Sequence, residues 1–274
     1  GVGDFISGVI LFDETIRQQA NNNRSMVEVI KDAGMVPGIK VDKGAKPLAN
    51  RPNETVTEGL DGLRDRCREY FDLGARFAKW RAVIRIGEGI PSQTCITTNA
   101  HALARYASLC QETGLVPIVE PEVLMDGNHD IDACDLVSET VLRAVFQELY
   151  HQGVKLEGTL LKPNMVLSGN TCPQQAGIDE VAERTVACLK RAVPAAVPGI
   201  VFLSGGQSDE DATRHLNAMN KGTSGLPWKL SFSYGRALQA APLKAWAGTN
   251  VEEAQQALYD RAKANGAACR GAYN

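Results

Sequence analysis

The chain has 274 residues, of which 44% are hydrophobic and 22% charged, with a formal net charge of -3. This composition supports a folded domain with a real core and excludes a disordered chain, while the interspersed charges argue against a nucleic-acid footprint or a membrane-binding face. The longest apolar stretch, at residues 192–203, is short and contains two prolines. We therefore expect a soluble protein without nucleic-acid or membrane partners.

Short apolar or β-branched runs alternate with stretches of helical period along the whole chain. This alternation is typical of βαβ units around a parallel sheet or barrel. An eight-stranded (β/α) barrel needs about 250 residues, and nothing here resembles a linker or an internal repeat, so we predict one domain over residues 1–274. The seven predicted strands are residues 6–12, 36–42, 77–86, 115–124, 156–165, 199–206 and 229–235.

Helices are predicted between these strands. Apolar side chains recur at spacings near three and four over residues 56–71 and 137–149, as in helices that cover a sheet. Residues 251–265 are predicted to form a helix as well. Ser208 and Asn250 resemble N-caps, because each is followed three residues later by an acid.

Ionisable side chains lie near the ends of four successive predicted strands. In a parallel barrel such groups have few favourable positions except at the mouth, where barrel enzymes keep their active sites. Taken alone, each pair of charges is equally well explained as a structural ion pair, and a lone lysine is more simply a solvated one. Together they favour a site formed by Lys40, Lys79, Arg81, Glu120, Glu122 and Lys162.

Two glycine-containing motifs predict an anion site. Gly205 and Gly206 follow a predicted strand and precede a helix, where backbone amides and the positive helix terminus can hold a phosphate. Arg236, after the next strand, can make a two-pronged contact with the same anion. A Gly-Gly pair is usually just a turn, and the nearby arginine strengthens the prediction. The predicted anion-binding residues are Ser204, Gly205, Gly206, Ser233, Gly235 and Arg236.

The sequence carries weak signals for metals and nucleotide cofactors. Residues 126–132 look like a calcium loop, but Ile131 and Val137 occupy the positions that need glycine and glutamate. The four histidines show no metal-ligand spacing, and no nucleotide-binding glycine motif is present, so we expect neither a metal nor a cofactor. Seven dispersed cysteines predict reduced and mostly buried thiols.

Six strings in the chain, in this order, resemble those of class I fructose-bisphosphate aldolases: GIKVDKG, FAKWR, VPIVEPEVL, LEGTLLKPNMV, FLSGGQS and SFSYGRALQ. The resemblance covers essentially the whole chain. It implies a (β/α)8 TIM barrel, usually a homotetramer, that cleaves fructose 1,6-bisphosphate reversibly into dihydroxyacetone phosphate and glyceraldehyde 3-phosphate without a metal. It also implies a role in glycolysis and gluconeogenesis in the cytoplasm, or in the Calvin cycle in the plastid stroma.

The resemblance further implies segments beyond both ends of the sequence. In this family a first strand, which bears an aspartate beside the reactive lysine, precedes the strand at residues 6–12. A C-terminal tail that ends in a functional tyrosine is expected to follow residue 274.

Carried over motif by motif, Lys162 resembles the lysine that forms a Schiff base, and Glu120 resembles the general acid/base. Lys79 matches a group close to the reacting carbons, and Glu122 matches a supporting acid. A free lysine titrates near about 10.4, so a nucleophilic one needs a lowered pKa. Burial and a second cation both lower it, and we predict that Lys79 is that cation.

The resemblance also assigns the two phosphates of the substrate. One is expected at the glycine motifs, and the other near Lys40 and Arg81. Two alternatives remain open. A different Schiff-base barrel enzyme, such as a transaldolase-like one, would share the lysine without needing two phosphate sites. A phosphosugar-binding or scaffold relative would bind ligand without forming an imine.

Overall fold

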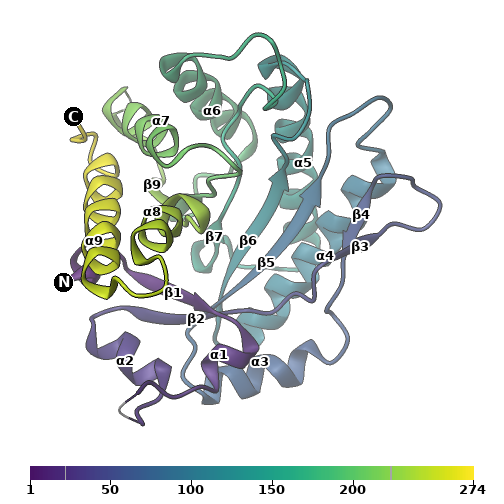
Figure 1. The fold of residues 1–274 in the computed structure, drawn as a ribbon. Coiled ribbons are helices and arrows are strands. Elements are labelled where there is room, and N and C mark those ends of the chain that lie inside the picture. The colour runs from purple at the N-terminus through teal and green to yellow at the C-terminus, as the bar shows by residue number, and fades with distance from the viewer. Residues whose placement is uncertain (22, 223) are drawn as a thin grey trace.

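A computed structural model describes residues 1–21, 23–222 and 224–274, and its centre is a curled parallel sheet. The described residues form seven strands in this sheet, which follow one another in chain order from β1 to β9. The predicted α/β barrel architecture is confirmed, with the sheet curled like an open barrel (Figure 1). The strands are β1 Gly8–Leu11, β2 Val36–Lys40, β5 Phe77–Ile84, β6 Val116–Val123, β7 Leu160–Leu161, β8 Gly199–Phe202 and β9 Lys229–Phe232.

Helices follow the strands along the chain, as the βαβ alternation predicts. The predicted helices at 137–149 and 251–265 are confirmed within longer ones. The described helices are α1 Asp13–Ile16, α2 Met26–Asp32, α3 Leu63–Asp72, α4 Gln93–Glu112, α5 Ile131–His151, α6 Ile178–Ala192, α7 Asp209–Gly222, α8 Arg236–Trp246 and α9 Val251–Ala268, with 3-10 turns η1 Val2–Asp4 and η2 Leu156–Gly158.

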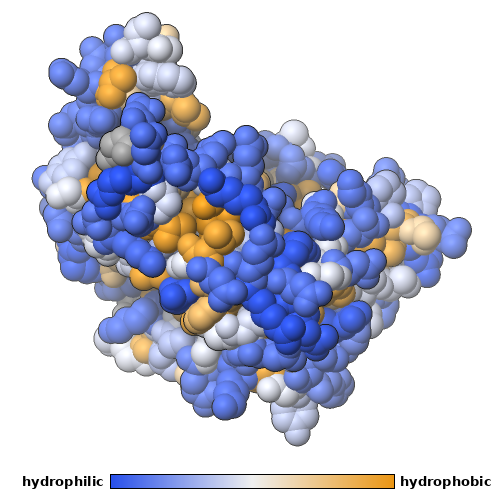
Figure 2. Space-filling view, turned by 90° about the horizontal axis from the view of Figure 1, so that it is seen from below, coloured by the Kyte–Doolittle hydropathy of each residue, from blue (hydrophilic) through white to orange (hydrophobic). Residues whose placement is uncertain are grey.

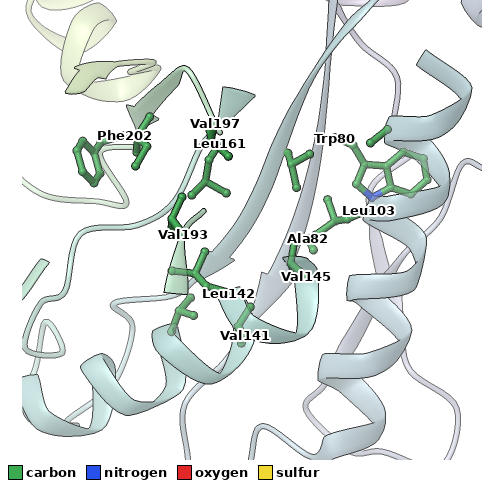
Figure 3. Close-up of a cluster of buried hydrophobic side chains, with 14 of the residues drawn as sticks. Trp80, Ala82, Leu103, Val141, Leu142, Val145, Leu161, Val193, Val197 and Phe202 are labelled. Carbon is green, nitrogen blue, oxygen red and sulfur yellow. The ribbon is translucent and has the colours of Figure 1, made fainter. Parts of the chain in front are cut away.

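The alternation of side chains along β5 separates the core from the site. Trp80 and Ala82 are fully buried, and the Trp80 ring stacks on Tyr106 of α4 with centroids 5.6 Å apart. Figure 3 shows both β5 residues within the cluster of buried hydrophobic side chains between strands and helices. Because successive residues of a strand point to opposite faces, Lys79 and Arg81 point away from this core. The same strand thus builds the core with one face and the site with the other.

Several predicted elements are longer than those in the structure, and two differ most. The strand predicted at 156–165 begins as a 3-10 turn and is extended in the sheet only at Leu160–Leu161. Pro163 lacks a backbone N–H and cannot continue a regular ladder. The helix predicted at 56–71 begins only at Leu63, because Thr55–Thr57 forms β4 and pairs antiparallel with β3 at Ala45–Pro47. A run of β-branched residues favours this extended conformation.

One of the two predicted helix caps is confirmed. The Ser208 hydroxyl accepts a hydrogen bond from the Asp211 backbone N–H at 3.0 Å and donates one to the Asp211 carboxylate at 2.7 Å. Asn250 precedes α9 as predicted, but its side-chain amide donates to the Glu253 carboxylate at 3.4 Å and does not cap the backbone. The backbone of Asn250 lies outside the extended conformation usual for a capping residue, which accounts for the difference.

The surface is mainly hydrophilic on the face drawn in Figure 2, where apolar residues gather in a hollow ringed by hydrophilic ones. In the part of the chain that the structure describes, no helix combines the length and apolarity needed to cross a membrane. All seven cysteines lie in the described residues and are free thiols; Cys269 is half-buried and the others are buried. The prediction that the thiols are mostly buried is therefore confirmed.

Candidate active site

Lys79, Glu120 and Lys162 meet where three neighbouring strands carry the chain toward the mouth of the curled sheet. The Glu120 carboxylate lies between the two amines: Lys162 Nζ is 3.1 Å from Oε1, and Lys79 Nζ is 3.1 Å from Oε2. All three residues are buried, with exposed fractions of 2% for Glu120 and 8% for each lysine. The structure thus brings together three of the residues that the sequence selected.

The strand register explains why these groups meet. β5 and β6 pair over eight residues, with Lys79 opposite Ile118. Glu120 lies two residues after Ile118 on the same face, and so is a diagonal neighbour of Lys79. In the next strand, Leu161 is paired with Val119. Lys162 therefore follows beside Glu120, and its backbone N–H donates to the Val119 carbonyl at 2.8 Å.

Burial lowers the pKa of Lys162 below its ordinary value. Removing water from an ammonium disfavours the charged form, and the nearby Lys79 cation acts in the same direction. The Glu120 carboxylate opposes both effects, because a negative neighbour favours the ammonium. The pKa is lowered on balance, so the amine is neutral, and able to act as a nucleophile, more often than a solvated lysine.

Lys40 and Arg81 lie beside this cluster, each paired with a buried acid. Arg81 Nε donates to the Glu122 carboxylate, and Lys40 Nζ donates to Asp42 Oδ1 at 2.6 Å. The Asp42 carboxylate also accepts from the backbone amides of Gly44 and Arg81 at 3.1 Å each. Asp42 was not selected from the sequence, although its position at the end of the predicted strand, two residues after Lys40, was a usable signal.

The glycine loop after β8 has a backbone conformation that favours glycine at two successive positions. Gly205 and Gly206 have φ angles of +62° and +99°, in the region that favours glycine. A Cβ added to Gly206 would lie 3.7 Å from Nη2 of Arg236, so this guanidinium is beside the loop. Ser204 is buried at the start of the loop, and Ser233 is held against β8 by a hydrogen bond from its N–H to the Phe202 carbonyl at 2.8 Å.

Two helices begin near this loop. The helix that follows it, α7, begins at Asp209, and the Ser208 hydroxyl accepts a hydrogen bond from the Asp211 N–H of its first turn. α8 begins at the exposed Arg236, directly after Gly235, which has no side chain with which to cap it. Its first amides and the Arg236 guanidinium can therefore serve an anion together.

Gln207 and His215 support the glycine loop and were missed by the sequence analysis. The Gln207 N–H and side-chain amide both donate to the Ser204 carbonyl at 3.0 Å. The Gln207 side-chain oxygen lies 2.7 Å from Nδ1 of the buried His215. Burial lowers the pKa of His215 to about 4, against a smaller opposite effect of Asp211. No local sequence motif marks this pair, because the two residues lie on different elements.

The metal signals that the sequence analysis rejected have ordinary structural explanations. Residues 126–132 form a polar loop that leads into α5, with Asp130 accepting a capping hydrogen bond from the Ala133 N–H at 2.9 Å. Among the residues that the structure describes, no group of three or more His, Cys, Asp or Glu side chains is arranged to hold a metal ion. The side chains at the mouth carry amines, carboxylates and guanidinium groups.

The curled parallel sheet, with a charged cluster at its mouth, is the arrangement of an α/β-barrel enzyme. A family model described as "Glycolytic: Fructose-bisphosphate aldolase class-I" matches residues 1–274. The chain therefore belongs to the class I fructose-bisphosphate aldolase family.

Individual relatives agree with this assignment. The chain is 63% identical over 273 residues to a probable fructose-bisphosphate aldolase class 1 of Xanthomonas axonopodis pv. citri, covering 98% of this chain and 81% of that protein. It is 57% identical over 270 residues to the cytosolic fructose-bisphosphate aldolase 6 of Arabidopsis thaliana, covering 98% and 75%. A solved structure of the aldolase from Plasmodium falciparum superimposes with a TM-score of 0.98 at 50% identity, covering 100% of this chain and 80% of that one.

The activity follows from the family. The protein is a lyase that cleaves fructose 1,6-bisphosphate reversibly into dihydroxyacetone phosphate and glyceraldehyde 3-phosphate, a reaction of glycolysis and gluconeogenesis. Of the alternatives that the sequence left open, the transaldolase-like enzyme is set aside by the family assignment.

Proposed function

We propose that Lys162 is the lysine through which this aldolase forms a Schiff base with its substrate. The observation that supports this assignment is the environment of its amine, which is 8% exposed and lies 3.1 Å from a carboxylate that also contacts Lys79. Burial lowers the pKa of Lys162. A neutral amine beside a carboxyl group that can carry protons has what imine formation requires.

In the proposed cleavage, the neutral Lys162 amine attacks the substrate ketone carbon and forms a carbinolamine. Glu120 holds the proton that Lys162 gives up on becoming neutral, and donates it to the departing hydroxyl, which leaves as water, so that an iminium remains. The bond between the third and fourth sugar carbons then breaks, and its electron pair moves into the iminium to give an enamine. The proton of the C4 hydroxyl passes to a base, and glyceraldehyde 3-phosphate leaves. Protonation of the enamine and hydrolysis of the imine release dihydroxyacetone phosphate and restore the amine.

The phosphates of the substrate are proposed to bind on either side of this amine. Gly205, Gly206 and Arg236 offer backbone amides and a guanidinium to one phosphate. Lys40 and Arg81, at the ends of neighbouring strands, offer positive charge to the other. Two anchored ends would hold the ketone at Lys162 and supply the orientation that the attack requires.

Reductive trapping tests the assignment of the lysine. Borohydride added with dihydroxyacetone phosphate reduces the imine to a stable amine, and peptide mass mapping then locates the added mass. We expect it on Lys162 in the wild type, and we expect its loss in Lys162→Met. Lys155→Met, a change at an exposed lysine of the same segment, serves as the control and should trap normally. Mass fixed on a different lysine overturns the proposal, and ligand binding without any trapping favours a non-catalytic relative.

We also propose that the protein works as a homotetramer in the cytoplasm. The resemblance to the family supports the assembly, and the name of the cytosolic Arabidopsis relative supports the compartment. Sedimentation velocity on the purified protein should give the mass of about four chains, and cell fractionation should place activity in the soluble cytoplasmic fraction. A single-chain mass or a plastid location contradicts the respective part of this proposal.

A further inference from the structure

The regular pairing between β6 and β7 ends at Lys162. In a parallel ladder alternate residues face the same neighbour, so Val119, Pro121 and Val123 of β6 face β7. The Val119 carbonyl accepts the last ladder bond, from the Lys162 N–H at 2.8 Å. Pro121 has no N–H with which to continue. The contact between Glu120 and Lys162 is therefore made across two chain segments whose regular pairing has just ended.

The side chain of Asn164 bridges this opening. Its Oδ1 accepts a hydrogen bond from the Val123 N–H at 3.0 Å, which is the next β6 donor that faces this gap. Its Nδ2 donates to the Ser138 hydroxyl of α5 and to the Met165 carbonyl, both at 3.0 Å. Asn164 is 8% exposed, so these bonds form in a buried setting where leaving them unmade is costly. One carboxamide thus joins the end of β6, the segment after Lys162 and a covering helix.

We propose that Asn164 is a positioning residue for catalysis, which holds the backbone of Lys162 at a fixed separation from the end of β6 that carries Glu120. This role rests on the proposed function of Lys162. The amine and the carboxylate must stay within hydrogen-bonding reach for proton transfer during imine formation. Without the Asn164 bridge, the bond from the Lys162 N–H to the Val119 carbonyl would have to hold the two segments at this point, while the Pro163 carbonyl stays bonded to the Leu203 N–H on its other side at 3.2 Å. A displacement of about 1 Å in such an arrangement is enough to cost on the order of 100-fold in rate.

Asn99 provides a matched control within the same chain. It is also buried, at 2% exposed, and its Oδ1 accepts from a strand N–H, that of Thr57, at 3.2 Å. Its Nδ2 donates to the carbonyls of Thr55 and Cys95 at 2.8 and 2.9 Å. Asn99→Ala removes the same kind of bonds as Asn164→Ala, but from a helix that holds the β3–β4 hairpin and not from the Lys162 segment.

The test compares steady-state kinetics and the rate of borohydride trapping in both variants, under conditions where circular dichroism shows each to be folded. We expect Asn164→Ala to lower kcat and the trapping rate by about 10- to 100-fold, with a change in KM below about threefold. Asn99→Ala should keep kcat within about threefold of the wild type while losing comparable thermal stability. Equal effects of the two substitutions on kcat overturn the proposal.

Ser138→Ala keeps the test decisive if Asn164→Ala does not fold. It removes one partner of the Asn164 amide and leaves the bond to Val123, so we expect kcat to fall by about 3- to 10-fold. A kcat equal to that of the wild type overturns the role of Asn164. Borohydride trapping of the wild type is run in parallel. Trapping on a lysine other than Lys162 contradicts the proposed function itself. Trapping on Lys162 at the wild-type rate in every variant contradicts only the inference about Asn164.

Discussion

The cluster around Glu120 and the glycine loop beside Arg236 handle charge in opposite ways. In the cluster, two amines and one carboxylate are almost completely buried and contact one another at 3.1 Å. At the loop, Arg236 is exposed and lies beside Gly206, where an anion is proposed to bind. A dry environment strengthens electrostatic effects and shifts pKa values, whereas an open one lets a solvated phosphate enter.

Because of this difference, we expect kinetics to distinguish the roles of the two regions. Interactions that act mainly on the reacting atoms change kcat, while interactions that hold a remote part of the substrate equally in ground and transition states change KM. Substitutions in the buried cluster are therefore expected to lower kcat, and substitutions at the loop to raise KM. The substitutions Glu120→Gln and Arg236→Met test this division.

The largest effect is expected from Glu120→Gln. Glutamine has nearly the same shape but cannot exchange a proton at neutral pH, so kcat should fall by about 100- to 10,000-fold, the usual contribution of a general acid or base. Glu120 raises the pKa of Lys162, so removing its carboxylate should make the amine neutral more often. A fall in kcat could therefore not be attributed to a less nucleophilic amine. Glu148→Gln, which alters an ion pair with His101 on the helical surface, is the control. A kcat within about threefold of the wild type contradicts the role of Glu120.

Arg236→Met should have the next largest effect, mainly on KM. Charge-assisted hydrogen bonds to an ionised group contribute about 1.5–3 kcal/mol, so KM for fructose 1,6-bisphosphate should rise by about 10- to 100-fold. Arg214→Met, at an exposed arginine of α7 that pairs with Glu210, should leave KM unchanged. If Arg236→Met instead lowers kcat at an unchanged KM, the division between the two regions fails.

The smallest effect on activity is expected from His215, which supports the loop through Gln207 and should act on stability instead. Its folded pKa is about 4, below the ordinary 6.5, so the unfolded chain takes up a proton first as the pH falls. The stabilising contribution is present above pH 6.5 and is lost between 6.5 and 4, by about 3 kcal/mol in total. Chemical denaturation at several pH values gives the free energy of unfolding as a function of pH. It should fall between pH 6.5 and 4 in the wild type and in the exposed control His151→Gln, and fall less in His215→Gln. If the free energy of unfolding of His215→Gln depends on pH as that of the wild type does, His215 is not the source of this pH dependence.

The sequence predicted those features that depend on local pattern. Strand alternation and charged strand ends were enough to select Lys79, Glu120 and Lys162, because each lies near the end of an apolar run and the ends of parallel strands converge. The distances between these side chains could not be predicted, because they depend on the register between strands that are far apart in the chain.

The features that the sequence analysis missed depend on such long-range contacts. Asn164 matters because Pro121, on a different strand, interrupts the ladder, and no pattern around Asn164 itself reports this. Asp42 and His215 likewise act through partners on other elements or on the backbone of a neighbouring strand. The early end of β7 was locally visible at Pro163, but the apolar run before it favoured a longer strand.

The central claim, that the Lys162 amine is uncharged more often than the amine of a solvated lysine, can be measured directly. Trace labelling with an acylating reagent over a series of pH values, quantified for each lysine by mass spectrometry, gives the titration of Lys162 with the exposed Lys190 as an internal reference. We predict that Lys162 titrates below the ordinary value of about 10.4 and that Lys79→Met raises its pKa, because one nearby positive charge is removed. A Lys162 amine that titrates at or above the pKa of Lys190, or that stays unreactive at every pH, would contradict the account.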